Sequence, residues 1–239
     1  MCRQNAKMSK SDFCSRVCTD GAASLAPIIL EVPAGHVTFK SVQKQLTTSW
    51  RHPHKPCPPV RKVYKIILTR TSFNAYKSYQ SRVEMAGQFV SLRRAPGNEN
   101  RRWHGTKRAC NLGDQGQTQL CSWPTCSLCS IIRCSFDIGL FGAKTGWGRF
   151  GQGIYTSSVA SKSDDYSQNQ RFSPLKALLL NKVIVGRGCK LTQDIVSLTA
   201  PPAGFDSVLG EKGGNLNYDE LVVYTNDAIR PSFLVMYDS

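Results

Sequence analysis

The sequence has no apolar stretch long enough to cross a membrane, which takes roughly 18 residues or more. Its longest apolar runs, 27–32 and 175–185, are short or interrupted by charged and polar residues. The start of the chain is basic, but the apolar core of about 7 to 15 residues that a secretory signal needs does not follow it. We therefore expect no membrane segment and an intracellular location, in the cytoplasm or the nucleus.

Internal repeats and heptads are also absent, which argues against solenoid and coiled-coil architectures. Of the 239 residues, 41% are hydrophobic and 20% are charged, which is ordinary globular composition. The length suits one well-buried domain or two small ones.

Acidic residues are scarce in the first half of the chain. Residues 1–110 contain 20 Lys and Arg against 5 Asp and Glu, whereas residues 111–239 contain 11 of each kind. The whole net charge of +15 therefore lies before residue 111. Such a field attracts anions and favours a partner such as nucleic acid, a phosphorylated ligand or an acidic protein. A solvated surface without such a partner would have the same composition.

Residue patterns predict an irregular basic arm, residues 1–26, followed by regular structure. β-branched runs and apolar spacing predict strands at 28–32, 60–68, 176–186 and 220–224 and helices at 37–50, 72–84 and 130–136. Proline and glycine predict irregular connections at 52–59, 93–102, 139–153 and 201–217. The last of these is long, and long loops in compact domains are usually functional.

Half of the ten cysteines fall within 25 residues, from Cys110 to Cys134. The two-residue gap between Cys126 and Cys129 lets both thiolates reach one zinc ion at about 2.3 Å, and we expect Cys110 and Cys121 to complete a structural site. Cys134 follows Cys129 by five residues on the expected helix, about 140° around its axis. Whether Cys134 replaces one of the four ligands stays open, as does a set of buried, reduced thiols without metal.

Four short strings combine small or β-branched residues with isolated polar groups: Trp103–Thr106, Gly151–Ser157, Ala160–Tyr166 and Asn217–Tyr224. In this order and spacing, over roughly residues 28–237, the chain resembles the ADP-ribosyltransferases of the poly(ADP-ribose) polymerase type. The resemblance implies an α+β fold, with a split mixed and antiparallel β-sheet, flanking helices and a catalytic domain spanning 27–239. The cysteine-rich stretch 108–134 departs from the family pattern and is expected to be a small zinc-binding insert.

The resemblance also implies a role in NAD+ binding for five residues. His104 would bind the adenosine ribose, and the backbone of Gly105 would hold the nicotinamide carboxamide. Ser163 would complete the hydrogen bonds to that carboxamide. Tyr155 and Tyr166 would stack on the two faces of the nicotinamide ring, which suits a cationic ligand.

Glu220 would be the central catalytic group of a triad with His104 and Tyr155. Cleavage of the nicotinamide–ribose bond builds positive charge on the ribose, and a fixed carboxylate stabilises that charge. The implied function is transfer of ADP-ribose from NAD+ to a protein acceptor. The sequence leaves open whether one unit or a polymer is transferred.

Two alternatives follow from the basic half and the cysteines. In the first, the acceptor of ADP-ribose would be a nucleic-acid end or a phosphate. In the second, the chain would be a zinc-stabilised nucleic-acid-binding module with weak or no catalysis. In the first alternative, a set of basic residues on both sides of His104 would guide the acceptor to the site: Arg93, Arg94, Arg101, Arg102, Lys107 and Arg108.

Overall fold

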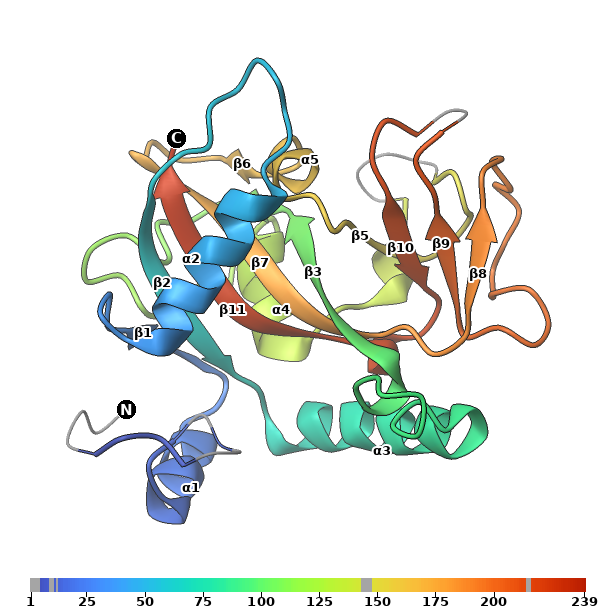
Figure 1. The fold of residues 1–239 in the computed structure, drawn as a ribbon. Helices are drawn as coiled ribbons and strands as arrows, with labels where there is room; N and C mark the ends of the chain where they lie inside the picture. Colours follow the sequence, from blue (N-terminus) through green and yellow to red (C-terminus); the bar gives the residue numbers. More distant parts are fainter. Residues whose placement is uncertain (1–4, 9–10, 12, 143–147, 214–215) are drawn as a thin grey trace.

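The computed structural model describes residues 5–8, 11, 13–142, 148–213 and 216–239. Parts of the expected arm and of the stretches 139–153 and 201–217 lie outside the described residues. Two main β-sheets with helices packed against them make up the described part of the chain (Figure 1). None of the described helices is long and apolar enough to cross a membrane.

The larger sheet has five strands, paired antiparallel in the order β1-β2-β11-β7-β3. Strands β7 and β11 are central and mostly apolar, and they are buried along most of their length, as expected for strands with packed layers on both faces. The bounds are β1 Ile28–Val32, β2 Val60–Ile67, β3 Glu99–Gly105, β7 Leu175–Ile184 and β11 Ile229–Asp238.

The smaller sheet has four strands in the order β5-β10-β9-β8, with β8 and β9 parallel and the other pairs antiparallel. A separate parallel pair joins β4 and β6. The division into two sheets and their mixed pairing confirm the α+β, split-sheet fold. The bounds are β4 Lys107–Arg108, β5 Ile154–Thr156, β6 Gln168–Asn169, β8 Gly188–Leu191, β9 Ser207–Gly210 and β10 Glu220–Val223.

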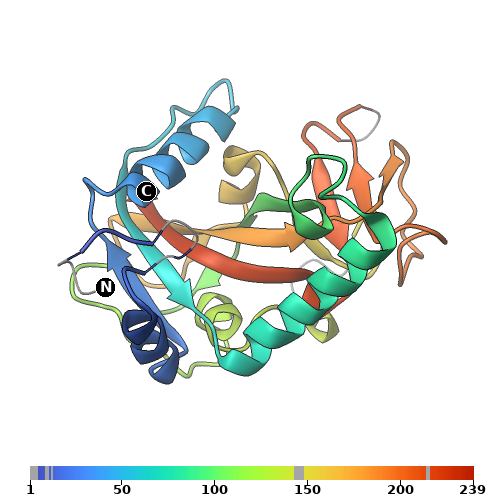
Figure 2. The same cartoon turned by 60° about the horizontal axis from the view of Figure 1, so that its bottom comes forward.

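Helices cover the larger sheet on both faces. Helix α2 buries Phe39, Val42 and Leu46 in one core cluster together with Trp103 of β3. Helices α3 and α4 contribute to a second cluster, and α2 and α4 lie on opposite sides of the sheet (Figure 1). Figure 2 shows α3 leading away from the end of β2. The bounds are α1 Arg16–Ser24, α2 Val37–Ser49, α3 Arg70–Gly87, α4 Ser127–Cys134 and α5 Ala160–Asp164.

Most expected elements are found near their predicted ends, and three differences have clear physical causes. Residues 16–24 of the expected irregular arm form α1, because Ser15 caps the helix by accepting a hydrogen bond from Cys18 N–H. Residues 99–102, expected to be a connection, begin β3, which pairs with β7 over its whole length. Residues 207–210 of the expected long loop form β9, anchored where Ser207 Oγ donates to Val185 O at 2.7 Å.

Candidate active site

The two main sheets meet where β3 passes β5. Trp103 and Ser157 form an isolated antiparallel bridge there, with N–H···O distances of 2.8 and 3.1 Å in the two directions. Trp103 is fully buried, and its indole N–H donates to Ser49 Oγ of α2 at 2.9 Å. This junction fixes the position of the two residues that follow Trp103, His104 and Gly105.

His104 is tied to β5 across the junction. Its Nδ1 lies 2.9 Å from the backbone oxygen of Tyr155, and its ring packs edge-on against Phe136 with the ring centroids 5.0 Å apart. Two contacts in different directions leave the imidazole plane little freedom. The first two members of the expected triad are therefore adjacent, although they are 51 residues apart in the sequence.

Gly105 lies directly against helix α5. A Cβ atom at this position would be 1.8 Å from Ser163 O, a distance that no real Cβ contact reaches. Ser163 is buried. The absence of a side chain on Gly105 thus permits close approach of its backbone to the backbone of Ser163.

Tyr155 is held rigidly by the loop that precedes it. Its hydroxyl accepts from Phe150 N–H at 2.9 Å and donates to Gly151 O at 2.7 Å. Burial raises the pKa of Tyr155 above its ordinary value, so the hydroxyl stays neutral at physiological pH. The ring of Phe141 stacks near it, with centroids 6.4 Å apart.

Tyr166 differs from Tyr155 in being 54% exposed. Tyr166 follows α5. Its partial burial raises its pKa, and the negative charge of the nearby Glu220 raises that pKa further. The charge of Glu220 also raises the pKa of Tyr155. The carboxylate of Glu220 therefore lies near both expected stacking residues.

Glu220 opens β10 and is mostly buried. Its Oε1 forms an ion pair with Lys162 Nζ at 2.8 Å, and the two side chains are 12% and 14% exposed. Its Oε2 is buried and has no hydrogen-bond partner among the described residues. Such an oxygen is unusual, because buried polar atoms are nearly always satisfied.

Lys162 and Asp219 are site residues that the sequence reasoning missed. Lys162 Nζ also donates to Tyr218 O at 3.1 Å, so it fixes the chain just before Glu220. Asp219 accepts from Ser158 Oγ at 2.6 Å and from Ser158 N–H at 3.2 Å, which ties the start of β10 to the end of β5. Both residues lie inside the strings singled out in the sequence, which was the available signal.

The four expected cysteine ligands come together beside α4. The sulfur atoms of Cys110, Cys121, Cys126 and Cys129 all lie within 4.8 Å of one another. Cys110 Sγ is 3.7 Å from Cys126 Sγ and 3.5 Å from Cys129 Sγ.

These separations fit a tetrahedral metal site. Four sulfurs at about 2.3 Å from one zinc ion are about 3.8 Å apart, whereas a disulfide brings two sulfurs to about 2.0 Å. The backbone N–H of Ala109 donates to Cys126 Sγ at 3.4 Å, a contact that favours a thiolate. Cys134 is exposed and lies outside the cluster, in agreement with its predicted position on the helix.

The expected path of basic residues to the site is wrong in part. Arg108 is fully buried and forms an ion pair with Asp114 at 2.9 Å, so it does not face an incoming ligand. Arg101 donates to Gln45 of α2 at 3.3 Å. Arg93 and Arg94 lie in the turn before β3, at the end of the strand opposite His104. All four residues are near His104 in the sequence. In the structure, the length of β3 separates Arg93 and Arg94 from His104, and Arg101 and Arg108 are engaged by partners within the protein.

His104, Tyr155 and Glu220 thus stand on β3, β5 and β10, the strands that meet at the junction of the two sheets. The family model of the poly(ADP-ribose) polymerase catalytic domain matches residues 38–213, and the chain belongs to this family. The matched range includes His104 and Tyr155 but ends before Glu220.

Two curated relatives are similar to the chain. Mouse protein mono-ADP-ribosyltransferase PARP3 is 26% identical over 181 residues, which is 74% of this chain and 26% of that protein. Human protein mono-ADP-ribosyltransferase PARP4 is 30% identical over 99 residues, which is 39% of this chain and 6% of that protein. The chain thus spans about a quarter or less of the length of these relatives.

Proposed function

We propose that the chain cleaves NAD+ at the nicotinamide–ribose bond and transfers ADP-ribose to a protein acceptor. The observation that carries the proposal is the unpartnered, buried Oε2 of Glu220, in a carboxylate whose other oxygen is fixed by Lys162. A ribose hydroxyl of NAD+ would supply the missing hydrogen bond after the side chains that cover this oxygen move aside. The cost of burying that oxygen is then offset in the complex with substrate.

Glu220 acts by electrostatic stabilisation in this proposal. When the bond from ribose C1′ to the nicotinamide nitrogen breaks, its electron pair leaves with neutral nicotinamide and C1′ becomes positive. The fixed carboxylate, which binds the 2′-hydroxyl, stabilises that charge. A nucleophilic group of the acceptor then attacks C1′; a carboxylate attacks as the anion, whereas a hydroxyl or an amine loses its proton to solvent.

The nicotinamide ring would lie between Tyr155 and Tyr166, with Gly105 and Ser163 at its carboxamide. The two hydrogen bonds of the neutral Tyr155 hydroxyl keep the tyrosine ring in place. His104, oriented by its contact with the Tyr155 carbonyl, would bind the adenosine ribose. These roles agree with the resemblance, and the geometry supports them because His104, Gly105 and Tyr155 lie at the junction of the sheets, with Ser163 packed against Gly105.

Gly105→Ala should raise the KM for NAD+ by about tenfold or more and lower the melting temperature. The new Cβ would meet a backbone atom, Ser163 O, so β3 and α5 would have to move apart, and overpacking of this kind costs about 1–3 kcal/mol. Steady-state kinetics and thermal melts measure both effects. Gly35→Ala is the matched control, because nothing lies within 4 Å of a Cβ at Gly35. An unchanged KM in Gly105→Ala would exclude close backbone approach as a requirement of the pocket.

A cavity beside the Glu220 strand offers room for an acceptor. It has a volume of about 580 Å³ and includes Tyr218, two residues before Glu220, in its lining. His52, His54 and Lys212 also line it, and the positive charge of Lys212 favours an acidic acceptor side chain. We infer that a carboxylate of a protein acceptor enters from this side.

We further infer that the four clustered cysteines bind one structural zinc ion. Four sulfur ligands leave no open position for water, so the ion would stabilise the insert without entering the reaction. The sulfur separations support this inference. The residues that would hold the ion are Cys110, Cys121, Cys126 and Cys129.

Labelled NAD+ distinguishes the proposed acceptor from the alternatives. The protein is incubated with it in parallel with a protein mixture, single-stranded DNA or RNA, and no acceptor. Label on protein is the expected result. Label on nucleic acid would replace the protein acceptor, and nicotinamide release without transfer would indicate a glycohydrolase.

A further inference from the structure

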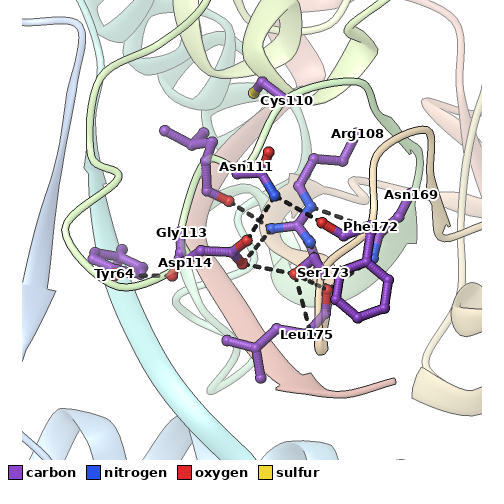
Figure 3. Close-up of polar contacts among 12 residues, drawn as sticks. Tyr64, Arg108, Cys110, Asn111, Gly113, Asp114, Asn169, Phe172, Ser173 and Leu175 are labelled. Carbon is purple, nitrogen blue, oxygen red and sulfur yellow. Dashed lines mark hydrogen bonds and ion pairs between the residues drawn. The ribbon is translucent and has the colours of Figure 1, made fainter.

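Arg108 is 1% exposed, and all three nitrogens of its guanidinium group are hydrogen-bonded (Figure 3). Nε donates to Asn169 Oδ1 at 3.0 Å, and Nη2 donates to Leu175 O at 2.5 Å. Nη1 donates to both Leu112 O and Asp114 Oδ1 at 2.9 Å. A buried charge is tolerated only when it is paired in this way, so these contacts fix the segments that they join.

One of these segments is the turn that follows the first cysteine ligand. Asp114 lies four residues after Cys110, and Asn111 Nδ2 donates to Asp114 Oδ2 at 3.0 Å. Tyr64 of β2 donates its hydroxyl hydrogen to Gly113 O at 3.1 Å and holds the same turn from the other side, at the left of Figure 3. These contacts hold the turn on two sides, and Cys110 lies immediately before it in the chain.

The other segment continues from the residues that we assign to nicotinamide binding. Strand β6 begins two residues after Tyr166 and pairs with β4, and Gln170 N–H donates to Arg108 O at 2.9 Å just beyond it. Asn111 Nδ2 also donates to Phe172 O at 3.0 Å. Side-chain and backbone contacts thus connect the cysteine turn to the chain that follows Tyr166.

We propose that Arg108 is a positioning residue that couples the cysteine metal site to NAD+ binding. Loss of metal makes the turn after Cys110 more mobile and weakens the hydrogen bond between Arg108 and Asn169 of β6. The part of the NAD+ site formed by Ser163 and Tyr166 then becomes less ordered. The hydrogen bonds of Arg108 go to the turn, β6 and β7, whereas Glu220 stands on β10. The effect therefore falls on KM for NAD+ more than on kcat. This inference rests on the proposed function.

Kinetics with and without metal test the coupling in Arg108→Lys, which keeps the charge but loses the planar fork of donors. Metal removal should raise the KM of the wild-type protein about tenfold, the scale of outer-shell effects. Arg108→Lys should raise KM with metal bound, and metal removal should then add about twofold or less, because the two changes break one network. If metal removal raised the KM of Arg108→Lys by the same factor as that of the wild type, the two effects would be independent and the proposal would be overturned.

Two further variants keep the test decisive. Asn111→Ala removes the contacts to Asp114 and Phe172 at a partly exposed position, and it replaces Arg108→Lys if that variant does not fold. Arg61→Gln is the control, because Arg61 forms an exposed two-bond ion pair with Asp238 outside the network. It should respond to metal removal as the wild type does.

Hydrogen exchange gives a readout that does not depend on activity. Metal removal should speed amide exchange at residues 163–170 in the wild type and in Arg61→Gln, and exchange there should already be faster in metal-loaded Arg108→Lys. Exchange that is unchanged after the metal has left, or a protein that takes up no metal, overturns the coupling. Faster exchange in a protein that binds NAD+ with a metal-dependent affinity but does not cleave it would support the coupling and reject the proposed function.

Discussion

Replacing Glu220 with glutamine lowers ADP-ribose transfer at saturating NAD+ by about 100-fold or more, the usual cost of removing a group aimed at developing charge. Glutamine has nearly the same shape and still offers an oxygen to a ribose hydroxyl, but it lacks the negative charge that faces C1′. The loss should therefore appear in kcat. Label transfer under steady-state conditions measures it.

The matched control for this variant is Glu211→Gln. Glu211 follows β9 and forms an exposed ion pair with Lys190, so its loss should leave transfer within about twofold. Melting temperatures must accompany both measurements, because Glu220→Gln also loses the ion pair with Lys162. If a folded Glu220→Gln protein kept transfer within about tenfold of the wild type, another group would have to stabilise the ribose.

Replacing Cys126 and Cys129 together with serine should remove the bound zinc, about one equivalent per chain in the wild type. Both sulfurs are fully buried, and the cysteine-rich stretch packs into the same core cluster as α3, α4 and the larger sheet. Because structural zinc contributes several kcal/mol to folding, the melting temperature should fall by about 10 °C or more. Anaerobic metal analysis and thermal melts measure the two effects.

Cys134→Ser is the control for the zinc prediction. Its sulfur is exposed and outside the cluster, so the variant should keep its zinc and melt within about 2 °C of the wild type. A purified wild-type protein without metal, or a double variant that retains it, would show that the cluster is a set of reduced thiols.

Local apolar patterns predicted α2, α3, α4 and the strands β1, β2, β7 and β10, but they did not predict β11, the middle strand of the larger sheet. The spacing of Phe39, Val42 and Leu46 predicted α2, and the structure buries these three side chains. The β-branched run at 60–68 predicted β2 equally well. The start of β3 was missed because Glu99 to Arg102 are all polar or charged, and these half-buried positions acquire strand structure from pairing with β7, 79 to 85 residues away in the chain.

The site was predictable to the extent that its residues lie in recognisable strings. His104, Tyr155, Ser163 and Glu220 are all found near the sheet junction, although their roles remain predictions. Lys162 was missed because a lysine in a polar string is ordinarily a solvated residue, and only the fold brings it to 2.8 Å from Glu220. The burial of Arg108 was missed because an arginine in a basic string is ordinarily solvated, and only the fold shows that it is enclosed and paired with Asp114 at 2.9 Å.

Release of nicotinamide from NAD+ by the folded protein tests the central claim most directly. With a protein acceptor present, the account predicts that nicotinamide appears together with an equal amount of protein-bound ADP-ribose. NAD+ that stays intact during prolonged incubation with folded, metal-loaded protein would contradict it.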